Sequence, residues 1–145
     1  MIWVLMILIL FPSVGYGESC FDQAGERYRV APDLLRVIAK QESGMNSKAT
    51  HINKDGTRDF GLMQINERWM PHLRHWGISK EGLMEPCQNI HVAAYIMRKL
   101  YNRYGENWIA IGHYNAAHPA KAAKYAWKVF QGLVDSAKPN RNKRK

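Results

Sequence analysis

The sequence is poor in cysteine and in acidic residues, and it has no hydrophobic run of membrane-spanning length. Its two cysteines come without a CxxC or HExxH spacing, so the usual patterns of a zinc site are absent. Lys and Arg number 21 against 12 Asp and Glu, which gives a formal net charge of +9. This excess excludes an acidic solvating protein and favours an anionic partner, such as nucleic acid, a membrane surface or a cell-wall polymer.

The length and composition indicate one globular domain. The chain has 145 residues, and 46% hydrophobic and 23% charged residues are ordinary usage for a globular protein. Residues 138–145 contain five positive charges and no apolar side chain, which predicts a disordered basic tail. Without these five charges the chain carries only +4, so the expected folded part, residues 18–137, gives little reason to expect nucleic-acid binding.

The first 17 residues have the pattern of a secretory signal peptide. Residues 1–14 are uncharged and mostly apolar, but they are too short to cross a bilayer comfortably, because a spanning helix needs about 20 apolar residues. Gly15 and Gly17 then supply the small residues of a signal-peptidase site. An uncleaved anchor is the alternative, since no Lys or Arg precedes the apolar run. Cleavage after residue 17 would leave an exported chain that begins at Glu18.

Cys20 and Cys87, the only cysteines, fit an exported protein. In an oxidising compartment the two can form a disulfide. By the loop-entropy argument, a bridge between such distant positions stabilises the fold by about 4 kcal/mol. Two separate buried thiols are the alternative.

Most of the exported chain has the pattern of helices. Pro32 is a typical first residue of a helix and Gly44 a typical terminating residue, and apolar side chains recur at helical spacing between them. The same reasoning predicts helices over residues 19–28, 32–44, 89–104, 108–112 and 119–137. The inner face of the last helix is expected to consist of Ala122, Ala123, Ala126, Phe130 and Leu133.

One extended region, residues 53–66, interrupts the helices. Asp55-Gly56 is a strong hairpin-turn signal, so the segments on either side are expected to form a small element of two or three strands. Together, the helices and this element predict an α+β fold that is mainly α.

Glu42 and Asp59 are the carboxyl groups best placed for chemistry. Glu42 follows Ile38 by one helical turn, at the end of an apolar stripe, where partial burial would raise its pKa and suit it to act as a general acid. Asp59 lies beside the hairpin turn and could supply a second, ionised carboxylate for the cleavage of a glycosidic bond. A surface glutamate and a turn aspartate that bonds its own backbone are the alternatives.

Three motifs in sequence order resemble the lytic transglycosylase (SLT) domain of the lysozyme superfamily, over residues 20–137. They are Glu42-Ser43-Gly44, Gly61-Leu62-Met63-Gln64-Ile65-Asn66 and Tyr114-Asn115-Ala116. The resemblance implies a lysozyme-like fold with a small β-hairpin beside the active-site cleft, and it implies that Glu42 is the essential acid and base. The substrate-binding residues that it implies, with no cofactor or metal ion, are Ser43, Met63, Gln64, Asn66, Tyr114 and Asn115.

Asp59 departs from the pattern of many lytic transglycosylases, which have no carboxylate at this position. Asp59-Phe60-Gly61 resembles the Asp-Tyr-Gly of animal-type lysozymes, so the chain is similar to a transglycosylase with a second, lysozyme-like carboxylate. The signal peptide and cysteine pair resemble those of the transglycosylases of type III secretion systems. Enzymes of type IV secretion and conjugation are the nearest alternatives. The resemblance implies a periplasmic enzyme that opens peptidoglycan locally, with an apparatus protein as partner.

The reaction that the resemblance implies is cleavage between N-acetylmuramic acid and N-acetylglucosamine, with closure of a 1,6-anhydro ring. Lysozyme-type hydrolysis and a non-catalytic glycan-binding assembly module are the alternatives. No membrane contact is expected except through the signal peptide before cleavage. Four tryptophans could stack on sugar rings, although most of them are expected in the core: Trp69, Trp76, Trp108 and Trp127.

The spacing of the polar residues after Asp59 predicts a break in the backbone. Gln64 and Asn66 follow Asp59 by an odd number of residues, which in an unbroken strand would place them on the opposite face. If all three address the substrate, the strand must be interrupted between them, and Gly61 is where this is easiest.

Overall fold

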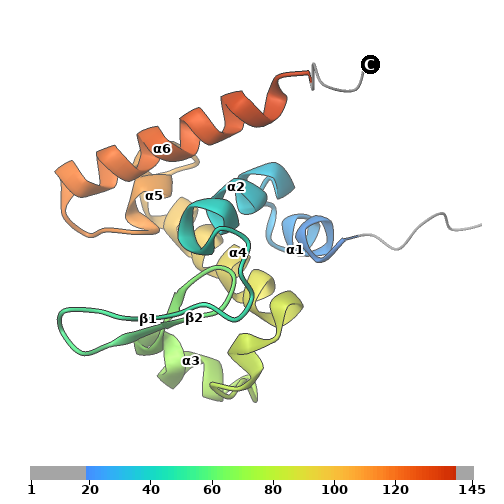
Figure 1. The fold of residues 1–145 in the computed structure, drawn as a ribbon, viewed down its shortest axis with the longest axis vertical. Helices are drawn as coiled ribbons and strands as arrows, with labels where there is room; N and C mark the ends of the chain where they lie inside the picture. The colour runs from blue at the N-terminus through green and yellow to red at the C-terminus, as the bar shows by residue number, and fades with distance from the viewer. Residues whose placement is uncertain (1–18, 140–145) are drawn as a thin grey trace, which may run out of the picture.

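The computed structural model describes residues 19–139 and forms a mainly helical structure with one small sheet (Figure 1). The signal-peptide prediction for residues 1–17 and the tail beyond residue 139 lie outside the described residues. The elements are α1 (Cys20–Tyr28), α2 (Pro32–Ser43), β1 (Thr50–Ile52), β2 (Arg58–Phe60), β3 (Ile65–Asn66), η1 (Glu67–Trp69), α3 (Met70–Arg74), η2 (Gly82–Met84), α4 (Pro86–Tyr104), α5 (Trp108–His113) and α6 (Pro119–Ala137). All five predicted helices are confirmed, and the mainly helical α+β prediction is correct.

Helix ends follow the local chemistry of the chain. Pro32 begins α2, and Gly44 ends it in the left-handed conformation with φ 62°, which glycine adopts without a steric penalty. The helix predicted to begin at residue 89 begins at Pro86 instead, because the Glu85 side chain accepts hydrogen bonds from the first backbone N–H groups of α4. The start of this helix was predicted from apolar spacing, and a polar capping residue does not change that spacing.

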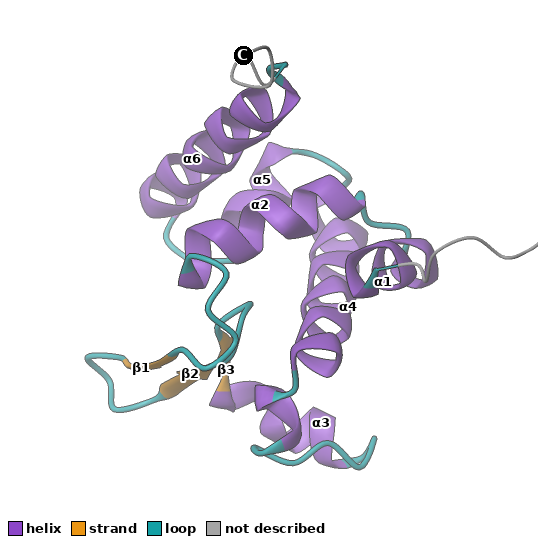
Figure 2. Cartoon of the chain, turned by 45° about the vertical axis from the view of Figure 1, so that its right-hand side comes forward, coloured by secondary structure: helices purple, strands orange, loops and turns teal. Residues whose placement is uncertain are grey.

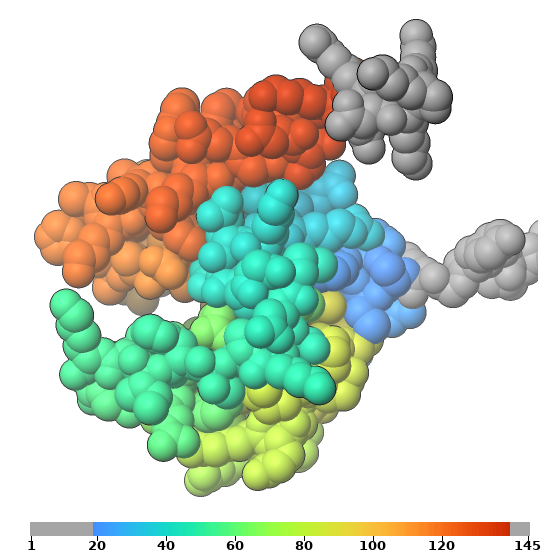
Figure 3. Space-filling model, viewed as in Figure 1, coloured from blue at the N-terminus to red at the C-terminus, as the bar shows by residue number. Residues whose placement is uncertain are grey.

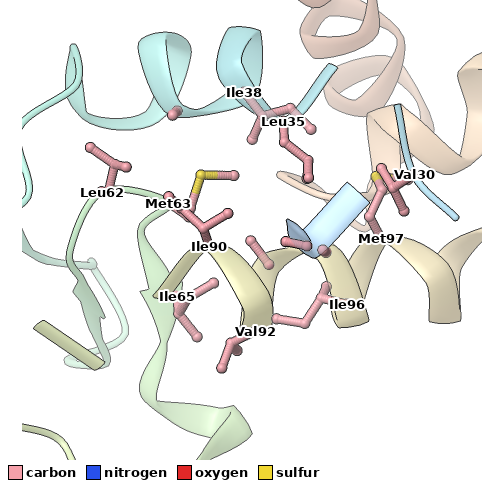
Figure 4. Packing of buried hydrophobic residues seen from close by; sticks show 14 of the residues in the cluster. Val30, Leu35, Ile38, Leu62, Met63, Ile65, Ile90, Val92, Ile96 and Met97 are labelled. Atoms are coloured by element: carbon pink, nitrogen blue, oxygen red, sulfur yellow. The ribbon is translucent and has the colours of Figure 1, made fainter. Parts of the chain in front are cut away.

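α4 lies at the centre of the fold, packed against α1, α2 and α5 (Figure 2). Its buried face includes Ile90 and Met97, as the apolar spacing predicts. Figure 4 shows Leu35 and Ile38 of α2 directed toward this region of the core. Burial of this apolar surface between the helices is the main stabilising contribution to the domain.

The extended region forms a three-stranded antiparallel sheet in the order β1-β2-β3, which confirms the prediction of two or three strands. Asn53 and Thr57 close the hairpin turn through a backbone hydrogen bond of 2.8 Å, and Gly56 takes a positive φ of 82° inside it. Asp59 pairs with Asn66 across the sheet. The register therefore places two polar residues of the expected site side by side.

The backbone breaks at Gly61, as the spacing of the polar residues predicts. Gly61 has φ 75°, and a Cβ atom there would lie 2.6 Å from the side-chain nitrogen of Asn89 and 2.8 Å from the carbonyl oxygen of Leu83. Asn89 is completely buried on α4; its amide donates to Phe60 O and Leu83 O and accepts from Met63 N–H. The turn is thus fixed to the central helix by hydrogen bonds and close packing.

The inner face predicted for α6 is partly wrong. Ala123 is exposed and Phe130 is 38% exposed, whereas Tyr125 and Val129 are buried. Both sides of this helix carry apolar residues, so apolar spacing alone does not identify the side that faces the core.

Cys20 and Cys87 form a disulfide, which confirms the predicted pairing. It joins the first residue of α1 to the first turn of α4. No helix within residues 19–139 is long and apolar enough to cross a membrane.

Candidate active site

A cleft of about 700 Å³ lies between the end of α2, the hairpin and the segment that follows α5. Figure 3 shows the surface hollowed between the hairpin, in green, and the orange residues of the last two helices. Six of the eight expected catalytic and substrate-binding residues line this cleft: Glu42, Asp59, Gln64, Asn66, Tyr114 and Asn115.

Glu42 lies in the last turn of α2, where its carboxyl group is largely removed from water. This burial raises the pKa of Glu42. Hydrogen bonding from Tyr125 and Asn115 lowers the pKa, and the negative charge of Asp59 raises it again, with burial the largest of these effects. The site therefore holds a proton on Glu42 at higher pH than an exposed glutamate would, which is what a general acid requires.

Tyr125 of α6 is a residue of this site that the sequence interpretation missed. Its hydroxyl donates a hydrogen bond of 2.5 Å to Oε1 of Glu42, across a large separation in sequence. Burial, followed by the charge of Glu42, raises the pKa of Tyr125, so its hydroxyl stays protonated and remains a donor. A tyrosine on the inner face of a helix needs a polar partner. That need was the available signal, but the predicted inner face of α6 did not include Tyr125.

Asp59 of β2 is held by amide groups on both sides. Asn53 Nδ2 donates to Oδ2 at 3.0 Å, and Asn66 Nδ2 donates to Oδ1 at 2.7 Å. Both amides also contact the hydroxyl oxygen of Thr57. An ionised carboxylate, which only accepts hydrogen bonds, fits this arrangement. The hairpin thus presents a fixed carboxylate in the same cleft as the buried carboxyl of Glu42.

Gln64 reaches the cleft because of the break at Gly61. Gln64 itself has a positive φ of 51°, and its Nε2 donates to the carbonyl oxygens of Ala49 and Gly61. These bonds hold the turn closed while the residue lines the cleft.

Tyr114 and Asn115 follow α5 and form part of the cleft wall. The Tyr114 hydroxyl donates to the carbonyl oxygen of Met63 at 3.0 Å, which ties this segment to the turn after β2. Burial, followed by the charges of Glu42 and Asp59, raises the pKa of Tyr114. The Tyr114 hydroxyl therefore stays protonated and remains the donor to Met63 O.

Ser43 and Met63, expected to bind substrate, do not line the cleft. The Ser43 hydroxyl donates to Leu62 O at 2.7 Å and accepts from Asn46 N–H, so it joins the end of α2 to the turn. Met63 is completely buried, and Figure 4 shows it among core side chains near Ile90. Their place in the motif reflects support of the cleft, because the turn directs the Met63 side chain inward.

The positions of the tryptophans differ from the prediction that most of them lie in the core. Trp69 lines the cleft, whereas Trp76, Trp108 and Trp127 are 51%, 44% and 60% exposed, so most are not in the core. Lys54 and Arg68 also line the cleft, where Arg68 forms an ion pair with Asp55 at 2.7 Å. Within residues 19–139, no group of three or more His, Cys, Asp or Glu side chains is arranged to hold a metal ion.

Comparison with known proteins agrees with this geometry. Residues 19–128 match the transglycosylase SLT domain family. The chain is 38% identical to protein IpgF of Shigella flexneri over 132 residues, which is 90% of this chain and 86% of the relative. It is 35% identical to invasion protein IagB of Salmonella typhi over 150 residues, 98% of this chain and 93% of the relative.

A further relative is the X polypeptide of Escherichia coli K12, which is 37% identical over 116 residues, 79% of this chain and 69% of the relative. The family match covers the end of α2, the hairpin and the segment after α5, which together build the cleft. The chain therefore belongs to the transglycosylase SLT domain family and is a lytic transglycosylase that acts on peptidoglycan.

Proposed function

We propose that the enzyme cleaves the bond between N-acetylmuramic acid and N-acetylglucosamine and releases a 1,6-anhydro-muramyl product. The observation that carries the cleavage is the pairing of two unlike carboxyl groups in one cleft, and ring closure is proposed from membership of the transglycosylase family. Glu42 is buried and has a raised pKa, and Asp59 accepts amide hydrogen bonds on both oxygens. Unlike environments of this kind separate the acid from the ionised group in glycoside cleavage.

In the proposed reaction, Glu42 transfers its proton to the oxygen of the scissile bond as the bond from that oxygen to C1 breaks. Asp59 stabilises the positive charge that develops on the muramyl ring. The muramyl C6 hydroxyl oxygen then bonds to C1 and returns its proton to Glu42, so no water is consumed. Tyr125 orients the Glu42 carboxyl throughout, and Gln64, Asn66, Tyr114 and Asn115 contact the saccharide.

The test of ring closure is the product of digesting purified peptidoglycan. The proposal predicts muropeptides with an anhydro end that borohydride does not reduce. Products heavier by one water, with a reducible end, would show that the enzyme is instead a hydrolase of the lysozyme type. Asp59 is the feature that makes this second activity worth testing.

The test of the site is a pair of carboxamide variants. Glu42→Gln should lower turnover by about 10²–10⁴-fold, the usual contribution of a general acid, while Asp59→Asn should retain measurable activity. Glu26→Gln, on the exposed surface of α1, is the matched control and should be unchanged. A Glu42→Gln enzyme that still cleaves at the normal rate would remove Glu42 from the mechanism.

We also propose that the enzyme works in the periplasm, after export by residues 1–17, and opens the wall locally for a secretion apparatus. The relative named invasion protein IagB supports this role, and so does the Cys20–Cys87 disulfide, because such bonds persist in oxidising compartments. Because uncontrolled cleavage would damage the wall, low intrinsic activity should rise when an apparatus protein binds. Equal turnover with and without the apparatus proteins would count against this role and leave the chemistry untouched.

A further inference from the structure

An apolar groove of about 580 Å³ lies between α5 and α6. Its main side chains are Trp108 and Ile109 from α5 and Ala123, Trp127 and Phe130 from α6. None of these five residues lines the catalytic cleft. The proposed cleavage reaction leaves the groove without a role.

The exposed apolar surface of residues 19–139 is concentrated here. Ile109 is 61% exposed, Trp127 60%, Trp108 44% and Phe130 38%, and Val134 on the next turn of α6 is 42% exposed. These are five of the eight large hydrophobic side chains that are exposed in this part of the chain. A contiguous apolar patch of this kind on a protein surface marks an interaction site.

The groove has a fixed shape. Gly112 lets α5 approach α6 so closely that a Cβ atom there would lie 2.5 Å from the carbonyl oxygen of Ala122. Trp127 stacks on Phe130 with ring centroids 5.2 Å apart, and Trp108 meets Phe130 edge to face at 5.5 Å. The aromatic wall therefore exists before any partner binds, which lowers the conformational entropy lost on binding.

Positive charge accompanies the groove. Lys121, Lys124 and Lys128 are exposed on α6 beside the groove, and residues 107–134, which build it, contain no acidic side chain. An occupant with acidic side chains beside its apolar face would complement this charge.

We propose that the α5–α6 groove binds an amphipathic helix of a partner protein, whose apolar face fills the groove and whose acidic flank meets the exposed lysines of α6, Lys121, Lys124 and Lys128. A row of side chains at positions i, i+3 or i+4, and i+7 fits a concave surface between two helices. A second copy of the chain would bring the same positive charges together, which disfavours self-association through this face. The inference depends on the proposed apparatus role only for the source of the partner.

The position of the groove links it to the cleft. His113 lines both, and α6 carries the groove residue Trp127 two positions after Tyr125, which bonds Glu42. A helix bound in the groove would therefore contact α6, whose Tyr125 hydrogen-bonds the carboxyl group of Glu42.

The test is site-specific photo-crosslinking in the bacterium that encodes the chain, with the full chain as the Glu42→Gln variant. Benzoylphenylalanine replaces Trp127, and the control places it at Trp76, an exposed tryptophan outside the groove. The expected result is an adduct at position 127 only, in which mass spectrometry maps the partner segment to an amphipathic helix with acidic flanking residues. An adduct with a second copy or with lipid, equal adducts at both positions, or no adduct would overturn the proposal.

A synthetic peptide of the crosslinked segment gives the quantitative arm. Trp127→Ala with Phe130→Ala should weaken its binding at least about ten-fold, as for anchor residues of interfaces, and Trp76→Ala less than about two-fold. Lys124→Glu should also weaken binding and reduce its dependence on salt. Equal affinity for the groove variants and the wild type would overturn the proposal. Binding is measured without turnover, so this result is independent of whether the proposed cleavage reaction is correct.

Discussion

At the scale of single residues, Glu42 is subject to opposing effects. Burial raises its pKa, and the hydrogen bond from Tyr125 lowers it by stabilising the carboxylate. In the proposed mechanism Glu42 must begin protonated, so activity should fall as the pH rises through this pKa. The Tyr125 hydroxyl therefore influences where the alkaline side of the pH profile lies.

Tyr125→Phe removes the hydroxyl and keeps the ring. Loss of a bond that lowers the Glu42 pKa should move the alkaline limb of the kcat/KM profile to higher pH, by up to about one unit for a hydrogen bond of ordinary strength. Turnover at the optimum should fall because the carboxyl group is less well oriented. The measurement is the pH dependence of wall solubilisation, with Tyr101→Phe, outside the cleft, as the control. A shift to lower pH would contradict the assigned role.

Glu42→Gln should also make the protein more stable at neutral pH. Because the folded state raises the pKa of Glu42, this group favours folding less as the pH rises above its unfolded value near 4.5. The glutamine does not titrate, so the difference in Tm from the wild type should grow as the pH rises above about 4.5 and level off above the raised pKa of the folded state. Scanning calorimetry across this range checks it. A variant that is less stable than the wild type by the same amount at every pH would refute the burial argument.

At the scale of elements, two glycines of the sheet region differ in surroundings although both have positive φ. Gly61 is pressed against Asn89 and Leu83, whereas nothing lies within 4 Å of a Cβ atom at Gly56. An alanine at either position bears the backbone strain, but only at Gly61 does it also collide with α4. The turn after β2 therefore depends on glycine more strongly than the hairpin turn does.

The matched pair Gly61→Ala and Gly56→Ala separates these effects. Gly56→Ala should lower the unfolding free energy by about 1–2 kcal/mol, which is the strain of the left-handed conformation alone. Gly61→Ala should cost at least about 2 kcal/mol more and reduce activity, because the turn that carries Gln64 must move. Urea denaturation and turnover measure both. Equal destabilisation by the two variants would show that the contact with Asn89 relaxes easily.

The sequence was most informative where single residues determine the ends of a helix or the position of a turn. Pro32, Gly44 and the Asp55-Gly56 turn bound their elements correctly because these residues constrain the backbone themselves. Ala122, Ala126 and Leu133 of the predicted α6 face do meet the core, but Phe130 was assigned wrongly because it belongs to an exposed apolar groove. That Tyr125 faces Glu42 is determined by tertiary packing alone.

The cleft was predictable to the extent that its residues are close in sequence or belong to a family motif. Asp59 and Asn66 could be placed together from the strand break at Gly61. Ser43 and Met63 could not be told apart from residues that line the cleft, because a motif contains supporting side chains as well as cleft-lining ones. Met63 differs from the cleft residues by its complete burial and Ser43 by its hydrogen bonds to Leu62 and Asn46, and both differences exist only in the folded chain.

At the scale of the whole molecule, the Cys20–Cys87 disulfide joins the N-terminal helix to the central one. Cys20→Ser with Cys87→Ser should lower the unfolding free energy by about 2–4 kcal/mol, because the unfolded chain gains conformational freedom. Activity at low temperature should persist, since neither cysteine lines the cleft. Denaturation with and without reductant measures the effect, and reduced wild type should match the double variant. A wild type that is insensitive to reductant would contradict this role.

The position of Glu42 one residue before the end of α2 has an electrostatic consequence. The peptide dipoles of a helix sum to a partial negative charge at its C-terminus, which disfavours a carboxylate there by about 0.3–1 kcal/mol and favours a cation. In the proposed reaction, the same helix end would help Glu42 keep its proton before cleavage and attract the positive charge on the sugar ring during it. A carboxylic acid grafted onto a helix N-terminus would experience both effects with the opposite sign.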